Sequence, residues 1–262
     1  MKIVEKLFLP LLFGLGLICV WEALVIFYEV PPYILPAPRD IAVSLWTDGP
    51  SLLAALAITL QVTVAALILA CVTGVGIAVL LVQSKLLERM LFPYAVFLQV
   101  TPIVTIAPFI IIWVDSVFVV LLILAWMAAV FPIISNTLLG LKSADRNLLD
   151  LFKLYGASRG QTLRRLLIPA ALPYFLGGVR ISGGLALIGT VVAEMVAGTS
   201  GESSGLASRL LEASYRLELS RALACFVLLS VTGYGIYAVL NWISHRLLQH
   251  WHESALDDST SA

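Results

Sequence analysis

Charged residues are scarce in this sequence of 262 residues, and charge of one sign does not dominate. Only 12% of the residues are charged, and the 16 basic and 16 acidic side chains cancel. Apolar residues make up 60%, with a mean hydropathy of +1.01. Soluble and disordered chains need more polar surface than this, and a neutral chain has no charge surplus for a nucleic acid. We therefore expect a membrane protein and no nucleic-acid partner.

Residues and motifs that carry chemistry are also few. The three cysteines, Cys19, Cys71 and Cys225, fall inside apolar stretches without ligand spacing, so neither a disulfide nor a metal site is expected. The sequence has no P-loop motif, no HExxH motif and no nucleophile elbow. We expect no enzyme activity, no metal and no cofactor, so the energy for any work must come from a partner.

Long apolar stretches are abundant, and a helix needs about 20 residues to cross the hydrocarbon core of a bilayer. Residues 7–28 are interrupted only by Glu22, and residues 173–196 only by Arg180 and Glu194. These charges lie towards the ends, where a charged head can reach the interface. Four further stretches contain no charged residue: residues 49–84, 90–114, 116–141 and 222–245. The sequence predicts an all-α polytopic membrane protein with about six transmembrane helices.

The basic residues predict the orientation of these helices. With both termini in the cytoplasm, eleven of the 16 basic residues lie inside and four outside, as the positive-inside rule requires. The outer four are Arg39, Arg209, Arg216 and Arg221. We expect a transmembrane domain over residues 1–246 and a disordered cytoplasmic tail over residues 247–262.

The longest inner loop, residues 142–172, is more than a connection. Leu148, Leu151, Phe152 and Tyr155 recur at helical spacing, which predicts an amphipathic helix opened by Ser143 and ended by Gly156. Ser158 and Gln161 form a capping-box pattern that opens a second short helix. Pro169 and Pro173 are expected to separate that helix from the next membrane helix. A helix–bend–helix of this kind, over residues 143–168, either docks a cytoplasmic partner or rests on anionic lipid.

This loop resembles the cytoplasmic "EAA" loop of the permease subunits of bacterial ABC importers. Gly156 and the run at residues 166–169 keep the family spacing, while residues 150–152, Asp-Leu-Phe, stand where the family has Glu-Ala-Ala. The resemblance implies that the loop seats in a cleft of an ATP-binding subunit. The residues expected to couple to the ATPase are Asp150, Tyr155, Gly156, Ala157, Ser158, Arg159 and Pro169.

The likeness extends over nearly the whole chain. Residues 31–38, 156–159, 169–173 and 192–194, together with Gly177 and Arg180, look like the nitrate, sulfonate and taurine branch of these permeases. The resemblance implies a multi-pass protein of the bacterial inner membrane. It also implies four partners besides membrane lipid: two ATP-binding subunits, a second copy of the permease, a periplasmic solute-binding protein and a small-molecule solute.

Polar groups inside two membrane stretches are candidates for a solute passage. In the stretch 90–114, Gln99, Thr101 and Thr105 accompany Pro102 and Pro108, which predicts a broken helix that lines a passage or a kink that improves packing. In the stretch 173–196, small residues recur every four positions and predict close helix packing, while the resemblance favours a passage there. The four candidates on that stretch are Ser182, Thr190, Arg180 and Glu194.

The two charged candidates have simpler alternatives. Arg180 could attract an anion, or it could reach lipid phosphate or cap loop carbonyls. Glu194 could act as a gate or be an ordinary interfacial carboxylate. Outside, the proline-rich residues 30–38 are expected to be extended and stiff, residues 198–205 to form a flexible loop and residues 206–217 a short amphipathic helix. These outer segments either meet a solute-binding protein or simply connect.

Together these observations predict the permease subunit of an ATP-driven importer for a small anion such as nitrate, taurine or an alkanesulfonate. The alternatives are an importer of a heterocyclic vitamin precursor, of pyrimidine or riboflavin type, and a secondary transporter that works without ATP. A secondary transporter would need coupling-ion ligands or an inverted repeat, neither of which is evident in the sequence.

Overall fold

The computed structural model describes residues 2–197 and 204–249, in which every regular element is a helix. The chain divides into two compact units. The first comprises Met1–Ile58 and Thr199–Val231, and the second comprises Thr59–Gly198 and Thr232–Ala262. Two long helices, α3 (Gly49–Val82) and α11 (Leu219–Leu248), contribute residues to both units. The prediction of an all-α fold is confirmed.

Within the described residues, four helices are long and apolar enough to cross a membrane. They are α3, α6 (Val117–Lys142), α11, and α9 (Ile168–Ala197) with the helical turns that precede it. A fifth span is present if α4 (Lys85–Val100) and α5 (Ile103–Trp113), which meet at an angle of 98°, count as one. In α1 (Lys2–Phe27) the apolar helix recognised is the shorter stretch Leu12–Phe27. Four of the six expected spans are thus confirmed, and the count of six stays a prediction.

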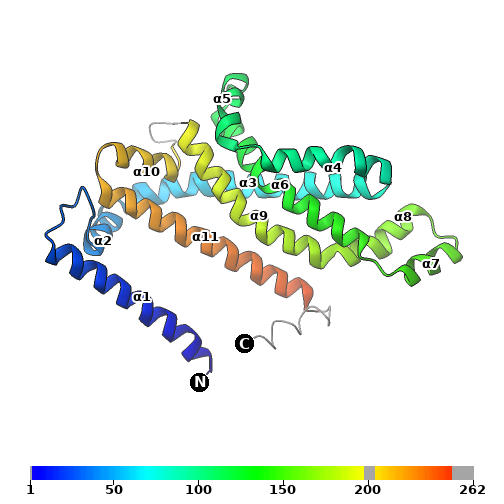
Figure 1. Ribbon diagram of the computed structural model, residues 1–262, viewed down its shortest axis with the longest axis horizontal. Coiled ribbons are helices and arrows are strands. Elements are labelled where there is room, and N and C mark those ends of the chain that lie inside the picture. The colour runs from blue at the N-terminus through cyan, green and yellow to red at the C-terminus, as the bar shows by residue number, and fades with distance from the viewer. Residues whose placement is uncertain (1, 198–203, 250–262) are drawn as a thin grey trace. The chain divides into compact units, whose positions relative to one another are not determined.

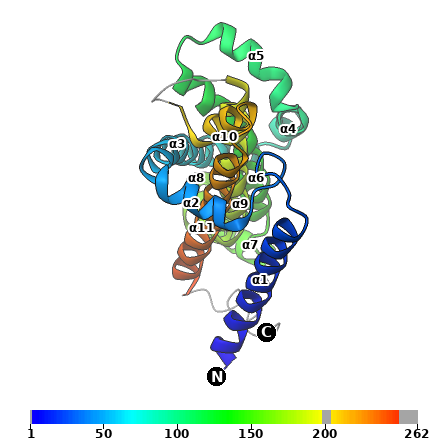
Figure 2. The same cartoon turned by 90° about the vertical axis from the view of Figure 1, so that its left-hand side faces the viewer.

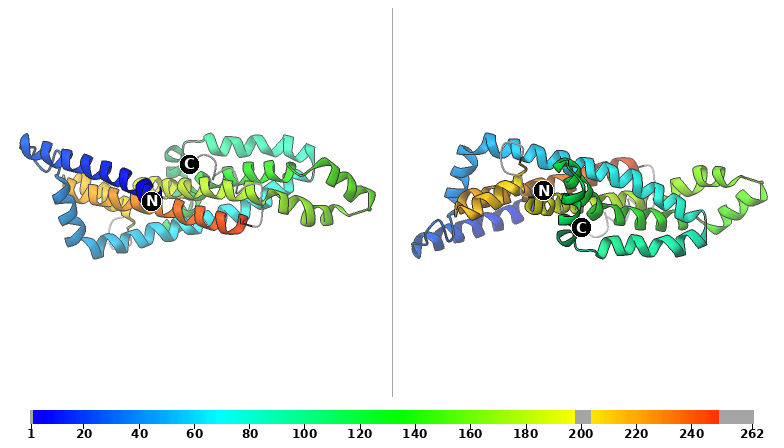
Figure 3. Two further views of the ribbon diagram at one scale, coloured as in Figure 1. Left: turned by 90° about the horizontal axis from the view of Figure 1, so that it is seen from below. Right: turned by 90° about the horizontal axis from the view of Figure 1, so that it is seen from above.

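The second unit is built around α6, which lies beside α9 (Figures 1, 2 and 3). Fourteen residues of α6 are buried, among them Leu124, Ala129, Val130 and Ile133, which have no exposed surface. Because lipid is as apolar as these side chains, close van der Waals packing rather than the hydrophobic effect favours the association of such helices. Helices α4, α5 and α9 of this unit all pack against α6.

Glycines let α9 approach α6 closely. A Cβ atom on Gly178 would lie 2.9 Å from the carbonyl oxygen of Pro132, and one on Gly189 would lie 2.8 Å from Cβ of Ala128. At the other end of the contact, a Cβ on Gly140 would lie 2.8 Å from Cα of Ala171. The predicted close packing through small residues of α9 is therefore confirmed.

Side-chain hydrogen bonds tie α3, α6 and α9 together inside this packing. The indole N–H of Trp126 donates to Thr73 Oγ1 at 2.8 Å, and the Ser182 hydroxyl donates to the carbonyl of Ala129 at 2.7 Å. The Thr63 and Thr190 hydroxyl oxygens lie 3.1 Å apart. In an apolar interior a polar group needs a partner, and here each partner lies on a neighbouring helix.

The first unit contains α1, α2 (Pro38–Thr47) and α10 (Leu206–Tyr215), with the first residues of α3 and α11. Helix α2 starts at the end of the proline-rich residues 30–38, in a stretch for which the sequence predicts no helix. It begins with Pro38, whose missing N–H is not needed in a first turn, and Glu22 of α1 accepts a hydrogen bond from the Arg39 N–H at 3.2 Å. Glu22 is therefore not simply a helix-end residue near water, because it joins α1 to the start of α2.

Of the predictions for the outer segments, the one for residues 30–38 is wrong and the one for residues 206–217 is confirmed. Residues 30–38 are not uniformly extended, because Ile34 and Leu35 both donate backbone hydrogen bonds to the carbonyl of Pro31 and form a turn. The predicted helix at 206–217 is confirmed as α10. Within the expected flexible loop at 198–205, residues 198–203 lie outside the described residues. Helix α11 continues to Leu248, and the rest of the expected tail, from residue 250, also lies outside them.

Candidate functional site

The 143–168 segment projects beyond the paired ends of α6 and α9 (Figures 1 and 3). It contains α7 (Arg146–Leu154), α8 (Arg159–Thr162) and a π-helical turn, η1 (Leu163–Leu167), that leads directly into α9. None of the residues of α7, α8 or η1 is buried. Leu163 and Leu167 of η1 rest on the core as partly buried side chains, so it is the outer part of the segment, α7 and α8, whose shape must come from local hydrogen bonds.

The start of α7 differs from the prediction by two residues. Asp145 is the N-cap, and its carboxylate accepts a hydrogen bond from the Asn147 N–H at 2.8 Å. Ser143, the predicted opening residue, instead ends α6, because its hydroxyl donates to the carbonyl of Gly140 at 2.9 Å. Ser143 and Asp145 thus mark the junction between the membrane helix and the segment.

The predicted bend at Gly156 is confirmed, and it needs glycine. Gly156 has a φ of +65°, in the left-handed region, and the next N–H, that of Ala157, donates back to the carbonyl of Phe152 at 2.9 Å. No atom lies within 4 Å of the place where a Cβ would stand. The requirement for glycine at this position comes from the backbone angle alone and not from crowding.

The second half of the segment opens with the predicted capping box. The Ser158 N–H donates to Gln161 Oε1 at 2.8 Å, and the Gln161 N–H donates to Ser158 Oγ at 3.2 Å. The predicted proline break is wrong, because the helix continues through Pro169 and Pro173. The π-turn η1 precedes Pro169 and shifts the hydrogen bonds by one residue, so the Ile168 N–H donates to the carbonyl of Leu163.

The segment carries an uncovered apolar edge. Leu154 and Tyr155 are 84% and 83% exposed, and Leu148 and Leu151 are also exposed. Beside this edge, the bend encloses a hollow of about 320 Å³ lined by Leu151, Phe152, Tyr155, Ala157, Gln161 and Arg165. Leu154, Gln161 and Arg165 were not among the predicted coupling residues. The available signal was the helical spacing: Leu154 lies three positions after Leu151, and Arg165 lies four positions after Gln161.

The structure brings six of the seven predicted coupling residues together in this segment. Asp150 forms an exposed ion pair with Lys153 at 2.8 Å, while Tyr155, Gly156, Ser158 and Arg159 are exposed at or beside the bend and Ala157 lines the hollow. Pro169 lies apart from them, half-buried in the first turn of α9. The exposed apolar edge, with the basic residues Arg159 and Arg165 beside it, is suited to binding in a complementary cleft.

The broken membrane helix has the predicted polar groups at its break. The helix stops at Val100 and resumes at Ile103 after a 98° turn. The Thr101 hydroxyl donates to the carbonyl of Phe97 at 2.8 Å, and the Thr105 hydroxyl donates to the carbonyl of Pro102 at 2.6 Å. Both carbonyls also accept a backbone hydrogen bond, from the Thr101 and Thr105 N–H groups at 3.0 Å, so each hydroxyl is a second donor that holds its side chain against the main chain at the break. Gln99 is exposed beside the break.

The four candidates on α9 have different surroundings. Ser182 and Thr190 have no exposed surface and hold α9 to its neighbours, so in this conformation their observed role is packing. Arg180 is half-buried, and its guanidinium donates to the side-chain carbonyl of Asn241 on α11 at 3.1 Å. Glu194 is fully buried, so the expectation of an ordinary interfacial carboxylate is wrong.

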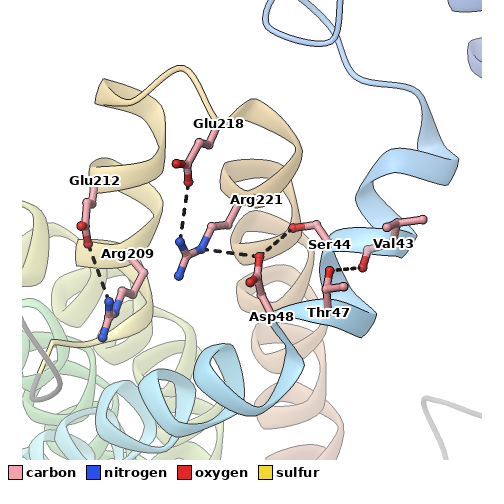
Figure 4. A network of polar contacts seen from close by, with 8 residues as sticks. All are labelled: Val43, Ser44, Thr47, Asp48, Arg209, Glu212, Glu218 and Arg221. Atoms are coloured by element: carbon pink, nitrogen blue, oxygen red, sulfur yellow. Dashed lines mark hydrogen bonds and ion pairs between the residues drawn. The ribbon is translucent and has the colours of Figure 1, made fainter.

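The first unit has its own polar network, on the side predicted to be outside (Figure 4). Arg221 lies 3.7 Å from the Asp48 carboxylate and 3.6 Å from that of Glu218, and the Ser44 hydroxyl donates to Asp48 at 3.3 Å. These contacts connect the end of α2 to the start of α11. They give the predicted outer surface a fixed local geometry.

Long apolar helices, an apolar helix pair with a 98° break and a locally capped protruding segment together fit a polytopic membrane transport permease. The family described as "Binding-protein-dependent transport system inner membrane component" matches residues 66–250, and the chain belongs to this family. It is a multi-pass permease subunit of an ABC importer, as the resemblance in the sequence implied. The alternative of a secondary transporter has no support from this family.

Several relatives are similar along most of their length. A probable ABC transporter permease of Haemophilus influenzae is 29% identical over 93% of this chain and 98% of its own. The riboflavin transport system permease of Chloroflexus aurantiacus is 33% identical over 91% and 88%, and the formylaminopyrimidine transport permease of Halalkalibacterium halodurans is 33% identical over 73% and 77%. The putative aliphatic sulfonates permease of Bacillus subtilis and the taurine permease of Escherichia coli are 27% and 26% identical.

Solved structures share the fold. A chain of the MetNI methionine ABC transporter in an inward-facing conformation has a TM-score of 0.63 at 20% identity, with 74% of this chain and 95% of that chain covered. A chain of an amino acid ABC transporter has a TM-score of 0.64 at 15% identity, with 78% and 97% covered.

Proposed function

We propose that the 143–168 segment docks the chain to an ATP-binding subunit, and that two permease copies and two ATP-binding subunits form one importer. ATP-driven movement of the ATP-binding subunits would push the two segments and switch the membrane helices between inward and outward access. The permease transmits this movement and hydrolyses nothing itself.

One observation carries this proposal: the uncovered apolar edge of a segment whose shape is fixed by local capping. A segment that only connected two membrane helices would not need a positive-φ glycine, a complete capping box and two apolar side chains more than four-fifths exposed. Preorganised shape lowers the entropic cost of binding, and exposed aromatic and aliphatic anchors supply the contact area.

Replacing Gly156 tests the docking role. Gly156→Val places a β-branched residue at a φ that it rarely adopts, so we expect loss of co-purification with the ATP-binding subunit while membrane insertion is kept. The matched control is Gly76→Val, at an exposed glycine of α3 where a Cβ meets nothing within 4 Å. Equal recovery of the ATP-binding subunit with both variants would contradict the docking role.

We further propose that solute from a periplasmic binding protein passes beside the break between α4 and α5. Gln99 is exposed there, and the threonine hydroxyls already serve backbone carbonyls. One face of α9 is exposed rather than packed against another helix, and it carries Ile181, Gly184 and Ile188. A Cβ on Gly184 would meet nothing within 4 Å. This face, rather than Ser182 and Thr190, is the part of α9 available to a passage or to a second copy.

For the solute, the support favours a nitrogen heterocycle over a small anion. The two relatives that are 33% identical carry the names of riboflavin and formylaminopyrimidine, whereas those named for sulfonates and taurine are 27% and 26% identical. The exposed groups beside the break are neutral, and Arg180 is engaged with Asn241. A thermal-shift screen of the cognate binding protein with riboflavin, formylaminopyrimidine, taurine and nitrate tests this order, and stabilisation by taurine or nitrate alone would reverse it.

A further inference from the structure

An ion pair joins two helices of the second unit directly before the 143–168 segment begins. Lys142, the last residue of α6, pairs with Glu88, in the first turn of α4. The two residues are 54 positions apart in the sequence. Lys142 is followed at once by Ser143, which ends α6, and three residues later by Asp145, the N-cap of α7.

The helix dipoles favour both charges where they stand. The carbonyl end of α6 carries partial negative charge, which a lysine in its last turn offsets, and the amide end of α4 carries partial positive charge, which Glu88 offsets. Ser84 caps the same end of α4 by accepting a hydrogen bond from the Leu86 N–H at 3.2 Å. The pair therefore links two helix ends of opposite polarity as well as two side chains.

Helix α4 is loosely held compared with its neighbours. None of its 16 residues is buried, whereas 14 residues of α6 are. Phe92, Ala95 and Leu98 rest on the core as partly buried side chains, and the ring centroids of Phe92 and Phe131 are 6.1 Å apart. The following helix is better anchored, because Ala107 and Ile110 of α5 are buried in a core cluster with residues of α6. Between them lies the 98° break.

The end of α6, from which the segment begins, is packed tightly against the start of α9, into which the segment leads. Gly140, two residues before Lys142, lies so close to Ala171 and Tyr174 of α9 that a Cβ there would meet atoms of both at 2.8 Å. The two chain ends from which the segment projects are thus clamped to each other. A displacement of the segment would move the ends of α6 and α9 together, and with them the Lys142 ammonium group.

From these contacts we propose that the Glu88–Lys142 pair is a coupling link: it passes displacement of the 143–168 segment to α4, which swings as a lever about the Thr101–Pro102 break. The link opens or closes the surface around Gln99 without any contact between the ATP-binding subunit and α4. This inference rests on the proposed docking function and names the positioning residues that connect docking to the passage.

The Glu88–Lys142 ion pair is better suited to transmitting movement between the two helices than to stabilising the fold. Its side chains are 43% and 28% exposed, and ion pairs with that access to water contribute little to folding. The ion pair sets the sign of the interaction between the two helix ends, since reversing one charge turns attraction into repulsion. We therefore expect variants to insert and assemble normally and to differ in their response to nucleotide.

The test uses the assembled complex of the permease with its ATP-binding subunit and needs no identified solute. In a background with Cys19, Cys71 and Cys225 replaced by serine, Gln99→Cys reports access to a membrane-impermeant maleimide, with and without ATP and vanadate. ATP hydrolysis and co-purification are measured on the same samples. The variants are Lys142→Glu, Lys142→Gln and the exchange of both charges, Glu88→Lys with Lys142→Glu.

The matched control is Arg89→Glu, which makes the same charge reversal as Lys142→Glu, at an exposed residue of α4 next to Glu88. We expect Lys142→Glu to keep co-purification and ATP hydrolysis while the nucleotide-dependent change in Gln99→Cys labelling is lost. We expect Lys142→Gln to weaken that change, the charge exchange to restore it, and the control to behave as the parent.

Four results would overturn the link. They are a normal labelling response in Lys142→Glu, no recovery in the charge exchange, equal loss in Arg89→Glu, and loss of co-purification in Lys142→Glu, which would place Lys142 in the docking surface instead. If the parent itself does not co-purify with the ATP-binding subunit, the docking function fails first and the link fails with it. Co-purification and labelling are separate readouts, so the two failures are distinguishable.

Discussion

The α6–α9 contact and the 143–168 segment are covalently continuous yet are built on opposite principles. In the contact, glycines and alanines bring two backbones together, and a Cβ on Gly178 or Gly189 would meet backbone or side-chain atoms within 3 Å. In the segment, no residue of α7, α8 or η1 is buried, and a Cβ on Gly156 would meet nothing within 4 Å. Glycine is required in both regions, for lack of space in one and for a backbone angle in the other.

This difference separates a rigid core from a preorganised surface. The contact resists any added volume because membrane helices associate through close packing. The segment resists only changes of backbone preference, and its side chains are free to meet a partner. A substitution should therefore act on folding in the first region and on docking in the second.

The largest effect is expected inside the contact. Gly189→Leu forces a large side chain against Ala125 and Ala128 and should cost about 1–3 kcal/mol or more, with loss of folded protein in detergent. Fluorescence-detected size-exclusion chromatography and thermal denaturation measure it. Gly76→Leu is the control, because that glycine of α3 is exposed with nothing near its Cβ position. Equal stability of the two variants would show that the glycine contact is not the determinant.

A smaller effect is expected at the bend. Gly156→Ala should cost about 1–2 kcal/mol of local conformational energy, because an L-residue strains in the left-handed region. Gly156→Asn should cost less, since asparagine tolerates that region. The rate of trypsin cleavage at Lys153 and Arg159 measures opening of the bend. Faster cleavage in the asparagine variant than in the alanine variant would contradict the backbone argument.

Loss of the capping box should be smaller again. Ser158→Ala removes the hydroxyl that accepts from the Gln161 N–H and should cost about 1 kcal/mol. We expect α8 to fray and the affinity for the ATP-binding subunit to fall, measured by microscale thermophoresis on the detergent-purified permease. Ser158→Asp keeps an acceptor at the cap and should bind nearly as the parent does. If both substitutions weaken binding equally, the serine contacts the partner rather than capping the helix.

The smallest effect is expected from a hydrogen bond in the core. Ser182→Ala removes one interhelical bond to the carbonyl of Ala129, and such bonds contribute roughly 0.6 kcal/mol within membranes. The melting temperature should fall slightly, while uptake stays close to that of the parent. A severe loss of uptake at normal stability would return Ser182 to the passage and contradict its assignment to packing.

Features encoded by neighbouring residues could be predicted from the sequence. The bend at Gly156 and the Ser158–Gln161 box depend on residues within five positions of each other, and both are as predicted. Helix α2 was missed although Pro38 and Asp40 stand at its first turn, because a proline-rich stretch precedes it. Ser143 and Asp145 are both good capping residues, and only the structure shows which helix each one serves.

Features that depend on distant contacts could not be read in this way. Ser182 and Thr190 are polar residues in an apolar stretch, a pattern that fits a passage as well as a buried hydrogen bond. Pro169 predicts a break, but the π-turn before it absorbs the missing hydrogen bond. The Glu88–Lys142 pair joins residues whose proximity follows only from the packing of α4 on α6.

Site-specific photo-crosslinking in intact membranes tests the docking role of the 143–168 segment most directly. A benzophenone amino acid is placed at Tyr155, which is 83% exposed at the bend, and in a parallel sample at Tyr234, which is 74% exposed on α11. The account predicts an adduct between the permease and the ATP-binding subunit from position 155 and none from position 234. Adducts from position 155 that contain only lipid would contradict it.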